Sequence, residues 1–316
     1  CNIGGVLPGT GPRRIVVGAH VDHLGLGTGS SLAPGQRAVH NGADDNASGV
    51  ATMLALAAAL AGVPAASRPY TVEFVAFGAE EMGLLGSKHY VAGLSPDARA
   101  ALVAMVNFDM VGRLQGDAVV VSGVGTSSLW KGLLAEVAAP LEVRPSEDGF
   151  GASDQASFYA AGLPVLHFCI GTHADYHKPS DDLDKINFPG AAAIGDLSLR
   201  VLGRLMRDQP NLDFIKVATP TPRAGGFRVS LGTVPDYGAK ADGVALADVR
   251  PGGPAAAAGL KAGDVITLLG TREIHSLDDY MASFAELQPG VEVPVRVLRN
   301  GAAVDLRITP AAPQRR

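Results

Sequence analysis

Short apolar runs alternate with longer helix-like segments through the first two-thirds of the sequence. The runs are rich in valine and phenylalanine and cover residues 14–19, 71–77, 102–109 and 164–168. The helix-like segments cover about residues 49–61, 82–93, 127–138 and 190–207. Strands that alternate with helices predict an α/β fold, in which helices flank a mixed, mostly parallel sheet. Ligands of such sheets bind at the carboxyl ends of the strands, so a functional site is expected there.

Composition and charge argue against nucleic-acid binding and against a membrane-spanning segment. The 26 Lys and Arg residues are fewer than the 31 Asp and Glu residues and form no basic cluster, so the charge pattern of a nucleic-acid-binding protein is missing. Residues 49–66 carry no charge, but this alanine-rich stretch is interrupted by Gly62 and Pro64 and is too weakly apolar for a membrane span. We therefore expect a buried helix there, no nucleic-acid partner and no membrane span in this chain.

A change of composition predicts a second domain. Proline, threonine and glycine without apolar periodicity are typical of a linker at residues 216–225, between domains at residues 1–215 and 226–316. Alternating apolar residues at 291–297 and 304–308 flank Asn300-Gly301, which predicts a β-hairpin. Two strands around a short helix are expected within residues 243–270, and an amphipathic helix at 276–287. The second domain is predicted to be small and β-rich.

Polar residues gather where the predicted strands end and in two loops. They are His20 and Asp22, Glu80 and Glu81, Asp109, Asp45 in the stretch HNGADDNASG (residues 40–49), and Tyr176 with His177. Singly, each has an ordinary structural explanation, and HNGADDNASG is also a suitable helix N-terminus. Together, two imidazoles and three carboxylates at one sheet edge suit two divalent ions. Cys1 and Cys169 are the only cysteines, so a zinc site built from thiolates is excluded.

The segments HxD, DDNASG, AEE, NFDM and YH, in this order, resemble those of the co-catalytic di-zinc aminopeptidase family. This family includes bacterial leucyl-type aminopeptidases and has glutamate carboxypeptidases and glutaminyl cyclases as relatives. The resemblance covers roughly residues 1–210 and implies the di-zinc exopeptidase fold, two Zn²⁺ cofactors and hydrolysis of N-terminal residues of peptide substrates. It also implies a secreted or periplasmic location. The sequence begins at Cys1 without a methionine or signal peptide, so we expect an upstream segment to be missing.

The resemblance implies a role for each polar residue of these segments. Asp45 bridges both ions, His20 and Asp109 complete one ion, and Glu81 and His177 complete the other. Asn46 lies beside this ligand set through a cis peptide bond with Asp45, and Asp44 is a neighbour without a ligand role. HNGADDNASG is therefore expected both to hold metal and to begin a helix.

Three further residues are expected to act beside the metal ligands. Glu80 adjoins a ligand but is itself free, so it can accept the proton of the attacking water and deliver it to the leaving amine. Asp22, two residues beyond His20, is the expected partner that orients the His20 imidazole. Tyr176 is expected to donate a hydrogen bond to the oxyanion of the tetrahedral intermediate, as a Tyr does in part of the family.

Substrate preference is predicted less directly. The resemblance suggests that residues 151–168 line the specificity pocket, with Phe158 and Phe168 as apolar walls, whereas Gln155 stands where many relatives have His. The remaining histidines are not needed by the metal site and are expected to be structural or surface residues: His23, His40, His89, His167, His173 and His275.

Residues 226–312 resemble a PDZ domain of the bacterial type, most clearly in PGGPAAAAGLKAGDVITLLG. PDZ domains bind an extended peptide beside an exposed strand, so a polypeptide C-terminus is the expected partner. The loop at residues 229–237, with Leu231 and Gly232 at its turn, is expected to bind the terminal carboxylate, and the helix at 276–287 to form the other wall of the groove.

Two other functions fit the same motifs. A carboxypeptidase or another amide hydrolase could use the same two ions, because metal ligands do not reveal which end of a substrate is bound. An inactive peptidase fold could serve as a PDZ adaptor, although it would have no chemical need for five ligands and Glu80.

Overall fold

The computed structural model describes residues 1–27, 31–33, 35–149, 151, 153–217, 229–236, 239, 241–275, 279–280, 283–284 and 286–312. The chain folds into two compact units, which we describe separately. The first comprises Cys1–Gly27, Arg37–Ile170 and His177–Val217. The second comprises Thr28–Gln36, Gly171–Tyr176 and Ala218–Arg316. Residues 218–225 of the predicted linker lie outside the described residues.

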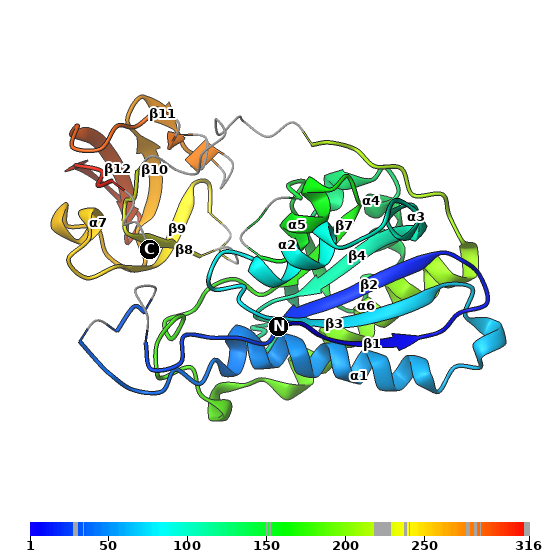
Figure 1. Cartoon of the computed structure of the whole chain (residues 1–316). Helices are drawn as coiled ribbons and strands as arrows, with labels where there is room; N and C mark the ends of the chain where they lie inside the picture. Colours follow the sequence, from blue (N-terminus) through cyan, green and yellow to red (C-terminus); the bar gives the residue numbers. More distant parts are fainter. Residues whose placement is uncertain are drawn as a thin grey trace. The chain divides into compact units, whose positions relative to one another are not determined.

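The first unit contains a seven-stranded sheet in the order β1-β3-β2-β4-β7-β5-β6 (Figure 1). Its strands are β1 (Ile3–Leu7), β2 (Arg14–His20), β3 (Thr71–Phe77), β4 (Leu102–Phe108), β5 (Ala118–Ser122), β6 (Glu142–Pro145) and β7 (Val165–Cys169). The central strands β3, β2, β4 and β7 are parallel, whereas β1 and β5 run antiparallel to β3 and β7. The mixed, mostly parallel sheet is confirmed. The four strands predicted from the sequence are its central ones.

Helices cover both faces of this sheet (Figure 1). The α-helices are α1 (Gly49–Ala61), α2 (Leu85–Ala92), α3 (Pro96–Ala101), α4 (Trp130–Val137), α5 (Gln155–Ala160) and α6 (Phe188–Asp208), and short helical turns lie at Ala43–Ser48, Ala65–Ser67, Val124–Thr126 and Leu183–Lys185. Ile15 and Val17 of β2 share a core with α1, α4 and α6, whereas Val16 between them packs in a second core with α2 and α5. Successive residues of a strand point to opposite faces, so a run that is apolar throughout is buried from both sides.

Helix α1 differs from the predicted buried helix. Met53, Leu56 and Leu60 are buried on one side, but Leu54 on the other is 58 % exposed. Alanine and leucine occupy both faces, so composition alone did not reveal which face is covered. None of the helices in the described part of the chain combines the length and hydrophobicity that a membrane crossing requires.

The second unit contains an antiparallel sheet in the order β13-β12-β10-β9-β8, with β11 paired to β10. Its elements are β8 (Thr233–Pro235), β9 (Val244–Val249), α7 (Pro254–Ala257), β10 (Val265–Leu269), β11 (Arg272–Glu273), β12 (Val293–Arg299) and β13 (Ala302–Ile308). Asn300 and Gly301 have φ angles of 52° and 79°, which two-residue hairpin turns require, so the predicted hairpin is confirmed. Within the predicted helix 276–287, Asp279, Tyr280 and Ser283 are helical, and residues 276–278, 281, 282 and 285 lie outside the described residues.

Candidate metal centre

Three neighbouring parallel strands bring polar residues to one edge of the sheet. His20 is the last residue of β2, Asp109 directly follows β4, and Glu80 and Glu81 follow β3. Asp45 comes from the turn Ala43–Ser48 that leads into α1. Because β3, β2 and β4 are parallel neighbours, their carboxyl ends meet at the same edge.

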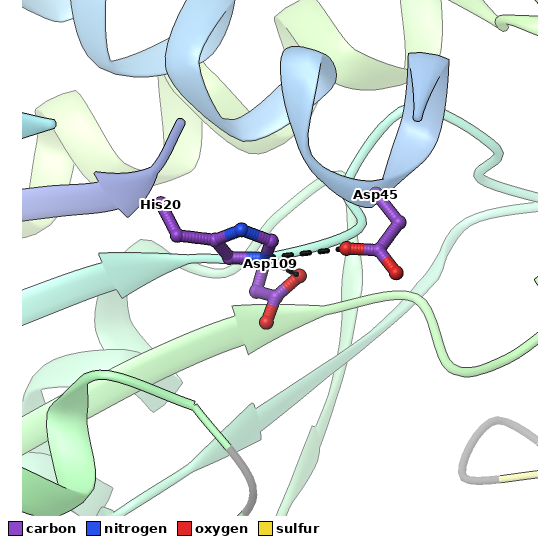
Figure 2. A group of neighbouring side chains, drawn as sticks. All are labelled: His20, Asp45 and Asp109. Carbon is purple, nitrogen blue, oxygen red and sulfur yellow. Dashed lines mark hydrogen bonds and ion pairs between the residues drawn. The ribbon is translucent and has the colours of Figure 1, made fainter. Parts of the chain in front are cut away.

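The five predicted ligands form two groups that share Asp45. His20 Nε2 lies 3.2 Å from Asp45 Oδ1 and 3.3 Å from Asp109 Oδ1 (Figure 2). His177 Nε2 lies 3.3 Å from Asp45 Oδ2 and 3.3 Å from Glu81 Oε2. Zinc binds nitrogen and oxygen at about 2.0–2.1 Å, so tetrahedral ligand atoms are about 3.3–3.4 Å apart. The spacing of both groups fits this geometry.

Charge is strongly concentrated among these residues. Burial would raise the pKa of Asp45, but hydrogen bonds with His177 and His20 outweigh it and hold that pKa well below its usual range. Burial also opposes the charge of His177, yet Asp45 and Glu81 raise its pKa to about 10. The carboxylates are therefore stabilised by positive charge between them. Protonated imidazoles supply that charge in this structure, and divalent cations would supply it if the imidazoles were neutral ligands.

Glu80 occupies a largely buried position beside this cluster. Burial is the largest cause that raises its pKa to about 9, and the carboxylates of Asp109 and Glu81 add to the rise against the opposing charge of His20. A nearby divalent cation favours the ionised form of a carboxyl group, which is the form that accepts a proton. Burial beside other carboxylates thus favours the protonated form of Glu80 in this structure.

Asp22 contacts the His20 imidazole, as predicted, and also holds the loop after β3. Its backbone carbonyl, not its carboxylate, lies 3.0 Å from His20 Nδ1, whereas the nearer carboxylate oxygen is 4.0 Å away. The carboxylate accepts the backbone N–H groups of Glu80 and Glu81 at 2.9 and 3.2 Å. The contact with His20 is made by the carbonyl because the loop after β2 turns the Asp22 side chain toward the loop after β3.

Asn46 and Asp44 stabilise the turn that carries Asp45. The peptide bond between Asp45 and Asn46 is cis, as the family resemblance implied. Asn46 donates to the carbonyl of Phe108 at 2.9 Å, and its Oδ1 accepts the N–H of Gly49 at 3.0 Å. Asp44 Oδ1 accepts the N–H of Gly112 at 2.6 Å. HNGADDNASG thus also begins a helix, through Asn46.

Sequence reasoning missed Asp181 and Arg113, which hold this turn from the opposite side. Asp181 Oδ2 accepts the backbone N–H groups of Asp44 and Asp45 at 2.9 and 3.0 Å. Its Oδ1 accepts a hydrogen bond from Arg113 at 2.6 Å, and the Asp181 side chain is fully buried. Asp181 stands among several acidic residues in SDDLD, so nothing in the sequence singled it out.

Replacement of Arg113 by Met is expected to lower the free energy of unfolding by about 3 kcal/mol, because the buried Asp181 carboxylate loses its counter-ion. Urea unfolding followed by circular dichroism measures the change. Arg207→Met is the control, since Arg207 is 65 % exposed in its pair with Asp208 and should cause no measurable loss. Equal losses in the two variants would contradict the assignment.

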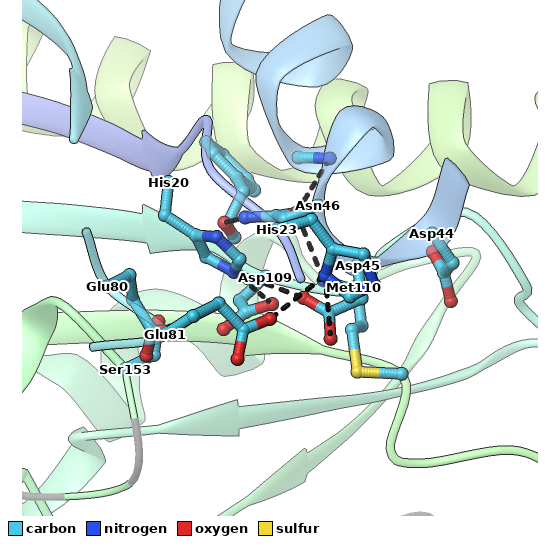
Figure 3. A network of polar contacts seen from close by, with 12 residues as sticks. His20, His23, Asp44, Asp45, Asn46, Glu80, Glu81, Asp109, Met110 and Ser153 are labelled. Atoms are coloured by element: carbon cyan, nitrogen blue, oxygen red, sulfur yellow. Dashed lines mark hydrogen bonds and ion pairs between the residues drawn. The ribbon is translucent and has the colours of Figure 1, made fainter. Parts of the chain in front are cut away.

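His23 was also missed, because its side chain was expected to be structural or at the surface. Its Nδ1 lies 2.9 Å from Glu81 Oε1 and 3.8 Å from Asp45 Oδ2 (Figure 3). The available signal was its position three residues after His20, in HVDH.

The predicted pocket walls are core residues instead. Phe158 and Phe168 are fully buried, Phe158 against Phe77 and Phe168 stacked on Phe108 at 5.5 Å. Both belong to apolar elements that pack on the sheet, so the prediction that they wall an open pocket was wrong. Tyr176 is half-buried and directly precedes His177 in the chain.

In the second unit, the predicted carboxylate-binding turn is well anchored. Leu231 is buried, and its carbonyl accepts the N–H of Ala255. Gly232 has a φ of 71°, and its carbonyl accepts the N–H of Arg250.

Known proteins are similar to this chain in sequence. "Leupeptin-inactivating enzyme 1" of Streptomyces exfoliatus is 33 % identical over 182 residues, which cover 56 % of this chain and 37 % of that protein. "Aminopeptidase YwaD" of Bacillus subtilis is 33 % identical over 172 residues, which cover 49 % of this chain and 36 % of that protein. A "Probable leucine aminopeptidase" of Arthroderma otae is 30 % identical and is covered to 52 %. The chain thus spans about a third to a half of the length of these relatives.

Solved structures and sequence models of families agree with these relatives. The structure of "BSAP, a zinc aminopeptidase from Bacillus subtilis" is similar with a TM-score of 0.52 and 30 % identity, over 64 % of this chain and 49 % of that one. The sequence model of the PDZ domain matches residues 216–309. The sequence model of Peptidase family M28 matches residues 2–202, well over half of the sequence. The chain therefore belongs to Peptidase family M28.

Proposed function

We propose that this protein is a zinc-dependent aminopeptidase whose site holds two Zn²⁺ ions. The observation that carries the proposal is that the two carboxylate oxygens of Asp45 face different imidazoles. Oδ1 faces His20, and Oδ2 faces His177. Asp45 would be shared by both ions, His20 and Asp109 would complete the ligands of one, and Glu81 and His177 those of the other. The names of the relatives, which include a zinc aminopeptidase, support zinc and the aminopeptidase reaction.

Each remaining group has a proposed task in peptide hydrolysis. When bound, the two zinc ions polarise the scissile carbonyl and acidify the attacking water. Glu80 accepts the proton of that water and gives it to the leaving amine. Asp22 holds the backbone of Glu80, and so keeps the Glu80 carboxyl close to the cluster. Tyr176 is proposed to donate a hydrogen bond to the tetrahedral oxyanion, since it adjoins His177 in the chain.

The two ends of a peptide substrate distinguish this proposal from the other amide hydrolases. We expect cleavage of leucine p-nitroanilide and no cleavage of its N-acetylated counterpart, because an aminopeptidase recognises the free amine. Chelator treatment should stop the reaction and added zinc should restore it. Cleavage of the blocked substrate at the same rate would overturn the aminopeptidase assignment and favour another amide substrate.

The second unit is proposed to be a PDZ domain at residues 226–316, joined by a linker at 216–225 to a peptidase domain at 1–215. Its partner is proposed to be the C-terminus of a polypeptide, which would add a strand beside β8 at the edge of the sheet. The whole 316-residue chain is expected to bind members of a peptide library that carry free C-terminal carboxylates. It is expected not to bind the same peptides when their C-termini are amidated. Equal binding of both forms would contradict this role.

A secreted or periplasmic location is also proposed, and cell fractionation tests it.

A further inference from the structure

The His23 side chain is largely buried beside the residues of the candidate metal centre. It is 8 % exposed, and its ring contacts those of His40 and His177, with centroids 6.4 and 5.8 Å away. Gly42 packs directly against it with a φ of 61°, and a Cβ atom there would lie 2.7 Å from His23 Cγ. A glycine at this point leaves the space that the imidazole occupies.

Distances distinguish His23 from the five predicted ligands. In each of the two groups, the imidazole nitrogen lies 3.2–3.3 Å from the two carboxylate oxygens, a spacing that zinc ligands also have. His23 Nδ1 is closer to Glu81, at 2.9 Å, and farther from Asp45, at 3.8 Å. The shorter distance is that of a hydrogen bond with a carboxylate. His23, Asp45 and Glu81 could themselves hold an ion, but the short distance to Glu81 favours a hydrogen bond between His23 and that predicted ligand.

The two oxygens of Glu81 have separate partners. Oε1 pairs with His23 Nδ1 (Figure 3). Oε2 faces His177 Nε2 at 3.3 Å. An ionised carboxylate carries no hydrogen, so His23 is the donor and its proton is on Nδ1. The carboxylate of Asp22 holds the backbone N–H of the same residue. Two adjacent residues that follow ligand His20 thus hold both the backbone and the side chain of Glu81.

We propose that His23 is a positioning residue of the metal centre, which fixes the Glu81 carboxylate so that only Oε2 is presented to the ion shared with Asp45 and His177. The inference rests on the proposed dinuclear zinc site. A hydrogen bond of this kind keeps the carboxylate in one orientation, and loss of such a partner typically lowers metal affinity 10–100-fold. The motif HVDH then contributes one ligand, His20, and two supports.

Stepwise competition between the whole 316-residue chain and a chelator tests this role through zinc affinity alone. His23→Ala is expected to weaken one of the two binding steps 10–100-fold and to leave the other close to wild type. His23→Asn is expected to restore the weakened step, because the asparagine amide can donate a hydrogen bond from about the position of Nδ1. His89→Ala, which removes an exposed histidine of α2, is the control and should leave both steps unchanged.

The outcomes separate the inference from the function on which it rests. Wild-type protein that binds fewer than two zinc ions would overturn the dinuclear site and this inference together. Two ions in wild-type protein, held equally well by His23→Ala, would overturn only the role of His23. Equal weakening in the Ala and Asn variants would show that the imidazole itself is needed, as a ligand or for packing, and would also overturn the proposed hydrogen-bonding role.

Discussion

Replacement of Asp45 by Ala is expected to remove both zinc ions and to lower the rate of hydrolysis at least about 10³-fold. Asp45 is 3 % exposed, and each of its two oxygens faces a different imidazole, so one substitution disrupts both predicted ligand groups. Metal ions supply several kcal/mol of transition-state stabilisation, and each 1.4 kcal/mol corresponds to about a tenfold change in rate. Metal analysis of the dialysed variant and hydrolysis of leucine p-nitroanilide measure the two effects.

Asp44→Asn provides the matched control for this substitution. Asp44 is equally buried and adjacent, but its Oδ1 accepts hydrogen bonds from Gly112 and Ser48, which an asparagine oxygen can also accept. We expect this variant to retain both ions and most activity. Retention of two zinc ions by Asp45→Ala would contradict the bridging role, whereas loss of zinc from both variants would point to a general collapse of the turn.

Replacement of Glu80 by Gln is expected to lower kcat about 10²–10⁴-fold while both zinc ions stay bound. General acid–base catalysis contributes about this factor, and glutamine has a similar shape but cannot accept the proton. The backbone hydrogen bond from Glu80 to Asp22 does not involve the side chain, so the neighbouring ligand Glu81 should keep its place. Steady-state kinetics at saturating substrate, with metal analysis of the same sample, separates loss of catalysis from loss of metal.

A distant carboxyl group serves as the control for Glu80. Glu147 is 49 % exposed in its pair with Lys131, and Glu147→Gln should leave kcat unchanged. A Glu80→Gln protein that hydrolysed substrate as fast as wild type would contradict its role as the base. Loss of zinc together with activity would instead mean that Glu80 supports metal binding.

The central strands of the first unit were predictable because they are apolar throughout, as strands covered on both faces must be. The strands β1 and β6 lie at the edges of the sheet, and β1 contains Gly4 and Gly5 and is mostly exposed, so neither carried that signal. The same reasoning placed His20 and Asp109 at the ends of neighbouring strands. The position of a residue at the end of a strand can therefore be predicted from the local sequence.

The supports of the metal centre could not be read in this way. Asp181 reaches the N–H of Asp44 across 137 residues of sequence, and that pairing follows only from the folded chain. For Asp22, the residue was predicted correctly as a neighbour of the site, but the choice between its carbonyl and its carboxylate depends on how two loops meet. Phe158 and Phe168 were misassigned because an apolar residue in a core and one in a pocket look alike in a sequence.

The dinuclear centre is tested most directly by titrating chelator-stripped protein with zinc while bound metal and hydrolysis of leucine p-nitroanilide are both followed. The arrangement of two ligand groups around Asp45 predicts saturation at two zinc ions per chain, as a two-metal site requires, with full activity only when both are bound. Saturation at a single ion with full activity, or activity in the stripped protein, would contradict it.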